Sequence, residues 1–359
     1  MPMTYFSDEF IDWLDAHADQ IDKESGQIAD TLLEKIAEQG VFAIGVPKEL
    51  GGQGGSRADV IAFLSELAQH SLTAAFISWG HRTFIENILA SEATFARETW
   101  LPDLLTGKRA AGTGLSNATK FLSGIEKLNV SIYEKEGRYF LRGRLPWVTN
   151  LRSDKFVAIF AASFENSSKD PLIIAVPSEA IGLARSADLE FVSLQGSNTA
   201  ALTFHDVALD WNWVLSEDAE VFLAQTRPAF LGYQFGLAFG LAERSLSEVE
   251  QSLFSTRSIL GEEYQDTLAK LESIRTDLLA GLDQDAYFIK NPRQLFELRI
   301  AIVDVVASSL LLELQASGGQ GYFKKSQSGF MRRWNEGAFL PIVSPSAVQL
   351  RLILEEGAK

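Results

Sequence analysis

Helical and strand patterning occupy separate parts of this chain, and this separation constrains its fold more than any other feature. Apolar residues recur at helical spacing over about the first hundred residues, and short β-rich runs follow as far as about Leu215. Beyond that point the pattern is helical to the end. Strands without intervening helices indicate an antiparallel barrel or sandwich. The chain is therefore predicted to be a multidomain α+β protein, with a helical domain (1–107), a β domain (108–215) and a helical bundle (216–359).

The individual elements can be expected at particular positions. A Gly-rich turn interrupts the N-terminal helices at residues 46–55, and Ser56 is expected to cap a helix that runs to about Gln69. The expected strands are residues 128–133, 139–142, 156–164, 172–176 and 200–204. The expected C-terminal helices are residues 230–253, 268–279, 294–317 and 347–355.

Composition excludes several classes of function. The formal charge of −15, from 32 basic and 47 acidic residues, argues against a nucleic-acid or membrane-surface binder. The absence of Cys excludes disulfides and thiolate chemistry, and the four His have no metal-ligand spacing, so no metal site is expected. The acidic, amphipathic N-terminal segment is unlike a signal peptide. We expect a cytoplasmic protein that binds neither nucleic acid nor membrane.

Three local segments could bind a ligand. Trp147 and Thr149, at a strand end, could present an indole face and a hydroxyl to a flat ring. Gly318 and Gly319 follow a long apolar helix, where glycine lets the backbone approach a ligand closely. Arg257 could meet a phosphate. Taken singly, each segment is more simply explained as a core Trp, a helix C-cap and a surface cation.

Six segments, taken in order, resemble motifs of the acyl-CoA dehydrogenase family of flavoproteins, which includes flavin monooxygenases on the same fold. They are residues 46–55 (P-x-x-x-G-G-x-G), 113–117 (ALTE-type), 147–150 (W-I-T-N), 195–199 (R-G-S-x-T), 257–261 (R-x-x-F-G) and 315–322 (Q-x-x-G-G-x-G-Y). Because the order and spacing agree along essentially the whole chain, the sequence is identified as a member of this family.

The resemblance implies N-terminal helices, a middle antiparallel β-barrel and a C-terminal four-helix bundle, with FAD between barrel and bundle and FMN as an alternative. By analogy, Ser116, Trp147 and Thr149 contact the isoalloxazine ring or its ribityl chain. The pyrophosphate and adenosine are assigned to Arg257, Gln315, Gly318 and Gly319. Because this second set acts partly across a subunit interface in the family, a homodimer or homotetramer is expected.

The resemblance breaks down at the catalytic base. Most members remove the substrate α-proton with a Glu, and counting from Asn335 and Glu336 places Ser344 at that position. Some branches carry the Glu on an earlier helix, where this chain has Thr226. Glu336 is the nearest carboxylate in sequence, but it is more simply a partner of Arg332 or Arg333. His81 is a further candidate polar group, although a structural histidine is the simpler interpretation.

Three functions remain open on the sequence. The leading hypothesis is an FAD-dependent oxidoreductase that oxidises the α,β bond of an acyl thioester, acyl-CoA or another carrier's, by hydride transfer to flavin N5. The first alternative is a flavin-dependent monooxygenase, which would dispense with the carboxylate base. The second is a catalytically silent flavin-binding relative. An electron-transfer protein or a flavin reductase is an expected partner of an active form.

Overall fold

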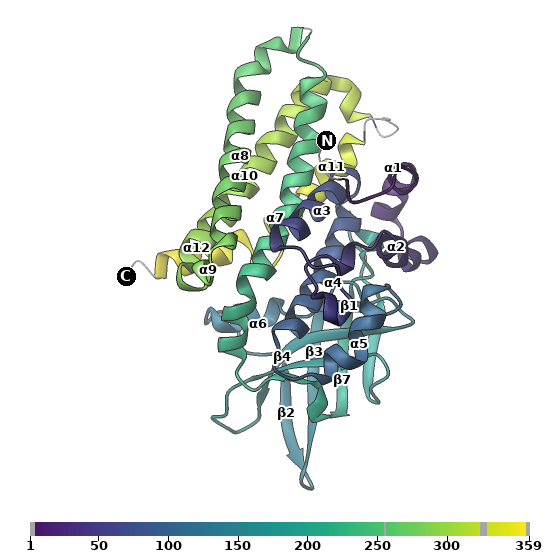
Figure 1. The fold of residues 1–359 in the computed structure, drawn as a ribbon, viewed down its shortest axis with the longest axis vertical. Helices are drawn as coiled ribbons and strands as arrows, with labels where there is room; N and C mark the ends of the chain where they lie inside the picture. Colours follow the sequence, from purple (N-terminus) through teal and green to yellow (C-terminus); the bar gives the residue numbers. More distant parts are fainter. Residues whose placement is uncertain (1–3, 255, 324–328, 357–359) are drawn as a thin grey trace.

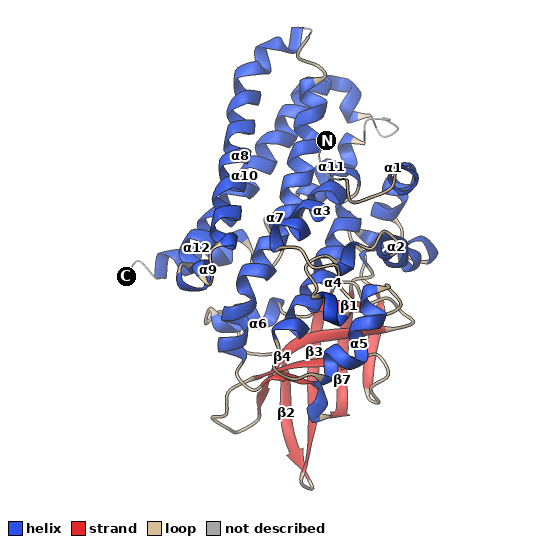
Figure 2. Ribbon diagram, viewed as in Figure 1, coloured by secondary structure: helices blue, strands red, loops and turns tan. Residues whose placement is uncertain are grey.

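The computed structural model describes residues 4–254, 256–323 and 329–356, and it has helices at both ends of the chain with a sheet between them (Figures 1 and 2). The strands gather at one end of the molecule, and the long helices extend to the other. Within the described part of the chain, no helix is long and apolar enough to cross a membrane. The changes from helix to strand and back fall between Leu105 and Ala110 and between Ser216 and Ala219.

The N-terminal part is helical, as predicted. Its helices are α1 (Asp8–Lys23), α2 (Gln27–Ala37), α3 (Arg57–His70), α4 (Leu72–Ala90) and α5 (Phe95–Leu105). Ser56 caps α3 as expected, because its hydroxyl accepts from the Asp59 backbone N–H while the Asp59 carboxylate accepts from the Ser56 N–H. Helix α4 is buried on nearly all sides, which explains why its apolar residues show no single face.

The middle part is one eight-stranded sheet. Its strands are β1 (Ala110–Thr113), β2 (Val130–Lys135), β3 (Arg138–Val148), β4 (Phe156–Phe164), β5 (Leu172–Pro177), β6 (Leu183–Asp188), β7 (Ala200–Ala208) and β8 (Val214–Ser216). The order is β6-β7-β3-β2-β4-β5-β8, and β1 pairs with β4. The expectation of antiparallel pairing needs one correction, because β4 runs parallel to both β1 and β2. The sequence pattern did not predict the short helix α6 (Ser116–Leu122), which follows β1.

All four expected C-terminal helices are present. They are α7 (Ala219–Glu250), α8 (Gly261–Asp283), α10 (Pro292–Ser317) and α12 (Ala347–Glu356), with the shorter α9 (Tyr287–Lys290) and α11 (Phe330–Gly337) between them. Helix α3 crosses α7 closely at Gly236 and Gly240. A Cβ at Gly240 would lie 2.0 Å from the Ser65 carbonyl oxygen, so a larger residue there would force the helices apart. This contact fixes the N-terminal helices against the bundle.

Candidate functional site

Two serines far apart in the sequence meet between the sheet and the bundle. Ser116 begins α6, and Ser344 lies in the turn between α11 and α12. Their hydroxyl oxygens are 2.6 Å apart. Gln234 of α7 donates its side-chain N–H to the Ser344 carbonyl oxygen at 2.8 Å, and Arg299 of α10 donates to the Gln234 side-chain oxygen at 2.9 Å. The turn that carries Ser344 is therefore held by two helices of the bundle.

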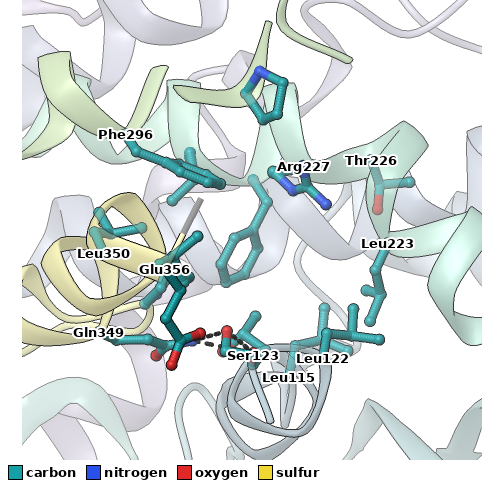
Figure 3. Close-up of a pocket in the computed structure, with 16 residues that line it drawn as sticks. Leu115, Leu122, Ser123, Leu223, Thr226, Arg227, Phe296, Gln349, Leu350 and Glu356 are labelled. Atoms are coloured by element: carbon teal, nitrogen blue, oxygen red, sulfur yellow. Dashed lines mark hydrogen bonds between the residues drawn. The ribbon is translucent and has the colours of Figure 1, made fainter. Parts of the chain in front are cut away.

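A cavity of about 350 Å³ lies on one side of α6, with walls from α6, α7, α10 and α12 (Figure 3). Its lining is mainly apolar and includes Leu115, Leu223 and Phe296. Pro345, the residue after Ser344, also lines it. At the wall between α6 and α12, Gln349 donates to the Ser123 hydroxyl at 3.1 Å. The volume is at the small end of the range for small-molecule sites, which is roughly 300–1,000 Å³.

A smaller pocket of about 100 Å³ is lined by residues of the same short helix and of β3. Ser116, Lys120 and Trp147 are among its lining residues. The Trp147 side chain is 51% exposed, and the Lys120 ammonium lies 5.7 Å from the centre of its ring. An indole exposed to this extent beside a polar pocket has an open face on which a flat ring can stack. The structure thus brings Ser116, Ser344 and Trp147 to one region.

Thr149 lies where β3 ends, against the turn at residues 195–199. Its hydroxyl oxygen accepts from the Thr199 hydroxyl at 3.2 Å. The next residue, Asn150, donates its backbone N–H to the Ser197 carbonyl oxygen at 3.0 Å and has a positive φ of 61°. Asn tolerates this left-handed conformation better than most residues. Residues 147–150 and 195–199, two of the segments that resemble family motifs, are therefore hydrogen-bonded to each other.

Arg257 and the glycine-rich end of α10 also meet, but elsewhere. The Arg257 Nε donates to the Ala316 carbonyl oxygen at 3.2 Å, and a Cβ at Gly318 would lie 3.2 Å from the Arg257 guanidinium. A Cβ at Gly319 would meet nothing within 4 Å, so its backbone is open to a ligand. The Gln315 side chain, one turn earlier, is bonded to its own helix. Helix α10 has 26 residues and is thus about 39 Å long at about 1.5 Å per residue. Its first residue, Pro292, lines the larger cavity, so this second group lies at the opposite end of the helix.

His81 lies in the interior and lines neither pocket. Its Nδ1 accepts from the Ala111 backbone N–H at 3.1 Å, so the proton is on Nε2, which donates to the Leu104 carbonyl oxygen at 2.8 Å. Burial lowers the pKa of His81 to about 4, which keeps the ring neutral. Because both ring nitrogens are occupied and the side chain is fully buried, we assign His81 a structural role: it joins α4 to the end of α5 and to β1.

The two other positions considered for a base are also structural. The Thr226 hydroxyl, on the cavity wall, donates to the Phe222 carbonyl oxygen at 3.0 Å. Glu336 is fully buried, and it accepts from the Leu72 backbone N–H at 3.1 Å and from Arg332 at 3.0 Å. Burial raises the pKa of Glu336. It pairs with Arg332, as the simpler interpretation predicted.

Sequence reasoning missed three residues of this region. Gln234 and Arg299 orient the Ser344 turn, and Arg227 lines the larger cavity. The available signal was a polar side chain within an otherwise apolar helical stretch. Such a residue is costly to bury without a partner, but the sequence does not show which partner it finds.

Comparison with known proteins agrees with this architecture. The model for the acyl-CoA dehydrogenase N-terminal domain matches residues 6–108. The probable acyl-CoA dehydrogenase YngJ of Bacillus subtilis (strain 168) is 24% identical over 360 residues, which cover 94% of this chain and 92% of that protein. The structure of butyryl-CoA dehydrogenase from Megasphaera elsdenii matches with a TM-score of 0.81 over 100% of both chains, at 16% identity. The prolyl acyl carrier protein oxidase AnaB matches with a TM-score of 0.80 over 98% of each chain, at 17% identity.

The chain therefore has the acyl-CoA dehydrogenase fold, with a helical N-terminal domain, a middle sheet domain and a helical C-terminal domain. Residues 6–108 match the N-terminal domain of acyl-CoA dehydrogenases, and nearly the whole chain is similar in sequence to a probable member of that family.

Proposed function

We propose that this protein is an FAD-dependent oxidoreductase that oxidises the α,β bond of an acyl thioester. The observation that carries the proposal is the contact between Ser116 and Ser344. It joins the segment after β1, where the family resemblance puts the flavin, to the position where that resemblance puts the base. An apolar cavity lies on one side of α6, and a pocket with an open indole face lies on the other. Hydride transfer from an acyl chain to a flavin ring requires two such neighbouring sites.

The residues around the smaller pocket fit a flavin ring. Trp147 offers an indole face for stacking, and Ser116 a hydroxyl that can hydrogen-bond. Thr149, two residues after Trp147, is buried and does not line this pocket, and its hydroxyl accepts from Thr199. When bound, the flavin supplies the hydride acceptor. FMN would satisfy this ring site equally, whereas only FAD would use a second site for pyrophosphate and adenosine.

The proposed second site supports a homo-oligomer. Arg257, Gly318 and the open backbone of Gly319 form a cationic, glycine-lined surface suited to phosphate. That surface lies about 39 Å along α10 from the cavity, too far for the same cofactor molecule to use both sites of one chain. We therefore propose that a second copy supplies it, in a dimer or a tetramer.

The chain's own contribution to the chemistry is binding and orientation. One of the Ser116 and Ser344 hydroxyls donates to the other, and the remaining proton can donate to a thioester carbonyl at the boundary between the two pockets. A neutral serine hydroxyl does not remove an α-proton unaided, because its oxygen is a very weak base and the strongly basic alkoxide is not populated near neutral pH. Of the described residues that line the larger cavity, Glu356 is the one carboxylate, and it is exposed at the end of α12.

The missing carboxylate favours a second candidate, a flavin-dependent monooxygenase on the same fold. Ser344 contacts another hydroxyl, and Thr226 is bonded to its own helix, so neither base position carries an ionisable group. A monooxygenase would receive electrons from a flavin reductase, whereas a dehydrogenase would pass them to an electron-transfer protein.

Flavin spectroscopy separates these functions. Purified protein is reconstituted with FAD and mixed anaerobically with acyl thioesters of CoA and of an acyl carrier protein. Bleaching of the flavin absorbance supports the dehydrogenase. No bleaching, together with a C4a-adduct spectrum after reduced flavin meets oxygen, supports the monooxygenase. Bound flavin that does neither identifies a silent relative, and failure to bind flavin at all contradicts the proposal.

A further inference from the structure

Backbone strain gathers in the turn between β6 and β7 at residues 193–199 and at a residue that bonds to it. Leu194 has a φ of 60° and Asn198 a φ of 47°, and their neighbour Asn150 has a φ of 61°. A left-handed backbone is uncommon for residues other than glycine, and for a bulky side chain such as leucine it is an outlier. Such conformations are unfavourable, persist only where the surrounding structure holds them, and are concentrated at functional sites.

A buried carboxylate at the end of α1 holds this turn. Asp22 is fully buried, and its Oδ1 accepts from the Leu194 backbone N–H at 2.7 Å and from the Ser193 hydroxyl. The helix backbone also touches the turn, because a Cβ at Gly196 would lie 2.4 Å from the Ile21 carbonyl oxygen. The carboxylate is therefore bonded to the strained leucine itself.

Asp22 makes these bonds with only one of its two oxygens. Its Oδ2 is buried and has no hydrogen-bond partner among the described residues. Burial raises the pKa of Asp22, although the two hydrogen bonds and the nearby Arg332 act in the opposite direction. A buried carboxylate with a bare oxygen is costly to the folded state. What Asp22 contributes in return is a directed acceptor for the turn.

The other side of the turn contacts the strand end that carries Trp147. The Asn150 backbone N–H donates to the Ser197 carbonyl oxygen at 3.0 Å. The Leu151 N–H donates to the Asn198 carbonyl oxygen, also at 3.0 Å. These bonds fix the backbone that follows Trp147, whose side chain lines the smaller pocket. The turn thus links the end of α1 to one wall of that pocket.

We propose that Asp22 is a positioning residue for the flavin ring. It holds the turn at residues 193–199 in its strained conformation, and the turn fixes the strand end from which Trp147 faces the ring. The inference rests on the proposed function, because it assumes a flavin ring in the smaller pocket. Asp22 does not line that pocket, so it acts only through the backbone of the turn.

The test compares variants of Asp22 with a variant of another carboxylate on α1. Asp22→Ala removes the acceptor, so it should weaken FAD binding by about tenfold or more. Asp22→Asn keeps an oxygen at the Oδ1 position and replaces the oxygen that has no partner, so it should restore most of the affinity. Asp15→Ala is the matched control, because the Asp15 carboxylate accepts from the His70 ring at 2.8 Å. It should lower stability and leave FAD affinity unchanged. Fluorescence titration of apoprotein measures the affinities.

Hydrogen–deuterium exchange of the full-length apoprotein gives a second readout that does not depend on the flavin. The Asn150 and Leu151 amides, which donate to the turn, should exchange about tenfold faster or more in Asp22→Ala than in the unmodified protein or in Asp22→Asn. The amides of β4 should exchange at the same rate in all of them, because that strand lies in the same sheet but does not bond to the turn. General destabilisation would instead raise exchange in both places.

Three results would overturn the inference. One is unchanged exchange at Asn150 and Leu151 in Asp22→Ala, and another is faster exchange there with unchanged FAD affinity. The third is a loss of affinity in Asp15→Ala as large as that in Asp22→Ala. Failure of the unmodified protein to bind FAD counts against the proposed function, and the exchange result then decides by itself whether Asp22 holds the turn.

Discussion

The hydroxyl oxygens of Ser116 and Ser344 lie 2.6 Å apart although 228 positions separate the two residues in sequence. One begins the short helix after β1, and the other follows α11 in the C-terminal part. A contact between a strand end of the middle domain and a turn of the bundle places both residues at the interface of two domains. Such boundaries are common positions for small-molecule sites.

Replacement of Ser344 by Glu should restore the carboxylate base that the family resemblance predicts at this position. A positioned general base contributes about 10²–10⁴-fold to rate. We therefore expect Ser344→Glu to bleach the flavin with a saturated acyl thioester at least about 10²-fold faster than the unmodified protein. Ser123→Glu adds a carboxylate to the cavity wall away from Ser116 and serves as the control. Stopped-flow absorbance gives the rates, and equal rates in Ser344→Glu and the unmodified protein would contradict the proposed geometry.

The two serines should be energetically coupled. We expect Ser116→Ala and Ser344→Ala each to lower the free energy of unfolding by about 0.5–1.5 kcal/mol, because each removes one partner of a part-buried hydrogen bond. The double variant should cost less than the sum of the two single variants by at least about 0.5 kcal/mol. Urea denaturation measures all four proteins. Ser317→Ala, at the far end of α10, should be additive with Ser116→Ala, and additivity of the Ser116 and Ser344 changes would contradict the contact.

Trp147 should contribute to flavin binding in a way that an equally exposed tryptophan does not. Trp147 and Trp211 are 51% and 49% exposed, but only Trp147 lines the smaller pocket. Stacking of a base on an aromatic side chain is worth about 1–3 kcal/mol, so Trp147→Ala should weaken FAD binding by about tenfold or more. Trp211→Ala should leave it unchanged. Titration of apoprotein by flavin fluorescence measures both affinities, and the same loss in both variants would show that the effect is not local.

His81 should make folding stability depend on pH between about 4 and 6.5. Its pKa is 6.5 as an ordinary side chain and about 4 when buried in the folded chain. As pH falls through this range the unfolded state takes up the proton first, so the stability that is present above pH 6.5 is progressively lost. The loss should approach about 3 kcal/mol, at about 1.36 kcal/mol per pKa unit. Unfolding free energies across this range should fall less steeply in His81→Gln, and an unchanged slope would contradict the assignment.

Much of the architecture could be predicted because local pattern decides it. The apolar periodicity marked the long helices, and Ser56 marked the start of α3 through its side-chain cap. The run at residues 156–164 became β4 with the same limits. The short elements β1, β6, β8 and α6 were missed, because three to seven residues carry too little periodicity to identify a strand or helix. The parallel pairing of β4 was missed because it joins strands that are distant in sequence.

The candidate site likewise combines residues that the sequence identified with contacts that only the structure shows. The sequence identified Ser116, Trp147 and Ser344 individually, and the structure brings all three to one region. It suggested His81 as a polar group of the site, whereas burial and two hydrogen bonds make that residue structural. The sequence marked Arg227 only as the Arg that follows the alternative base position at Thr226, because its place on a cavity wall beside Phe296 depends on tertiary packing.

The sequence by itself therefore determined the order of helical and strand domains, the resemblance to a family and the lack of a carboxylate at the expected base positions. These follow from residue identity and from spacing within short segments. The tertiary structure alone decided that Ser116 meets Ser344, that Arg257 and Gly318 lie at the other end of α10, and that Arg227 faces a cavity. The physical reason is that burial, desolvation and hydrogen bonding depend on neighbours from distant parts of the chain, which only the packing of α6, α7, α10 and α12 brings together.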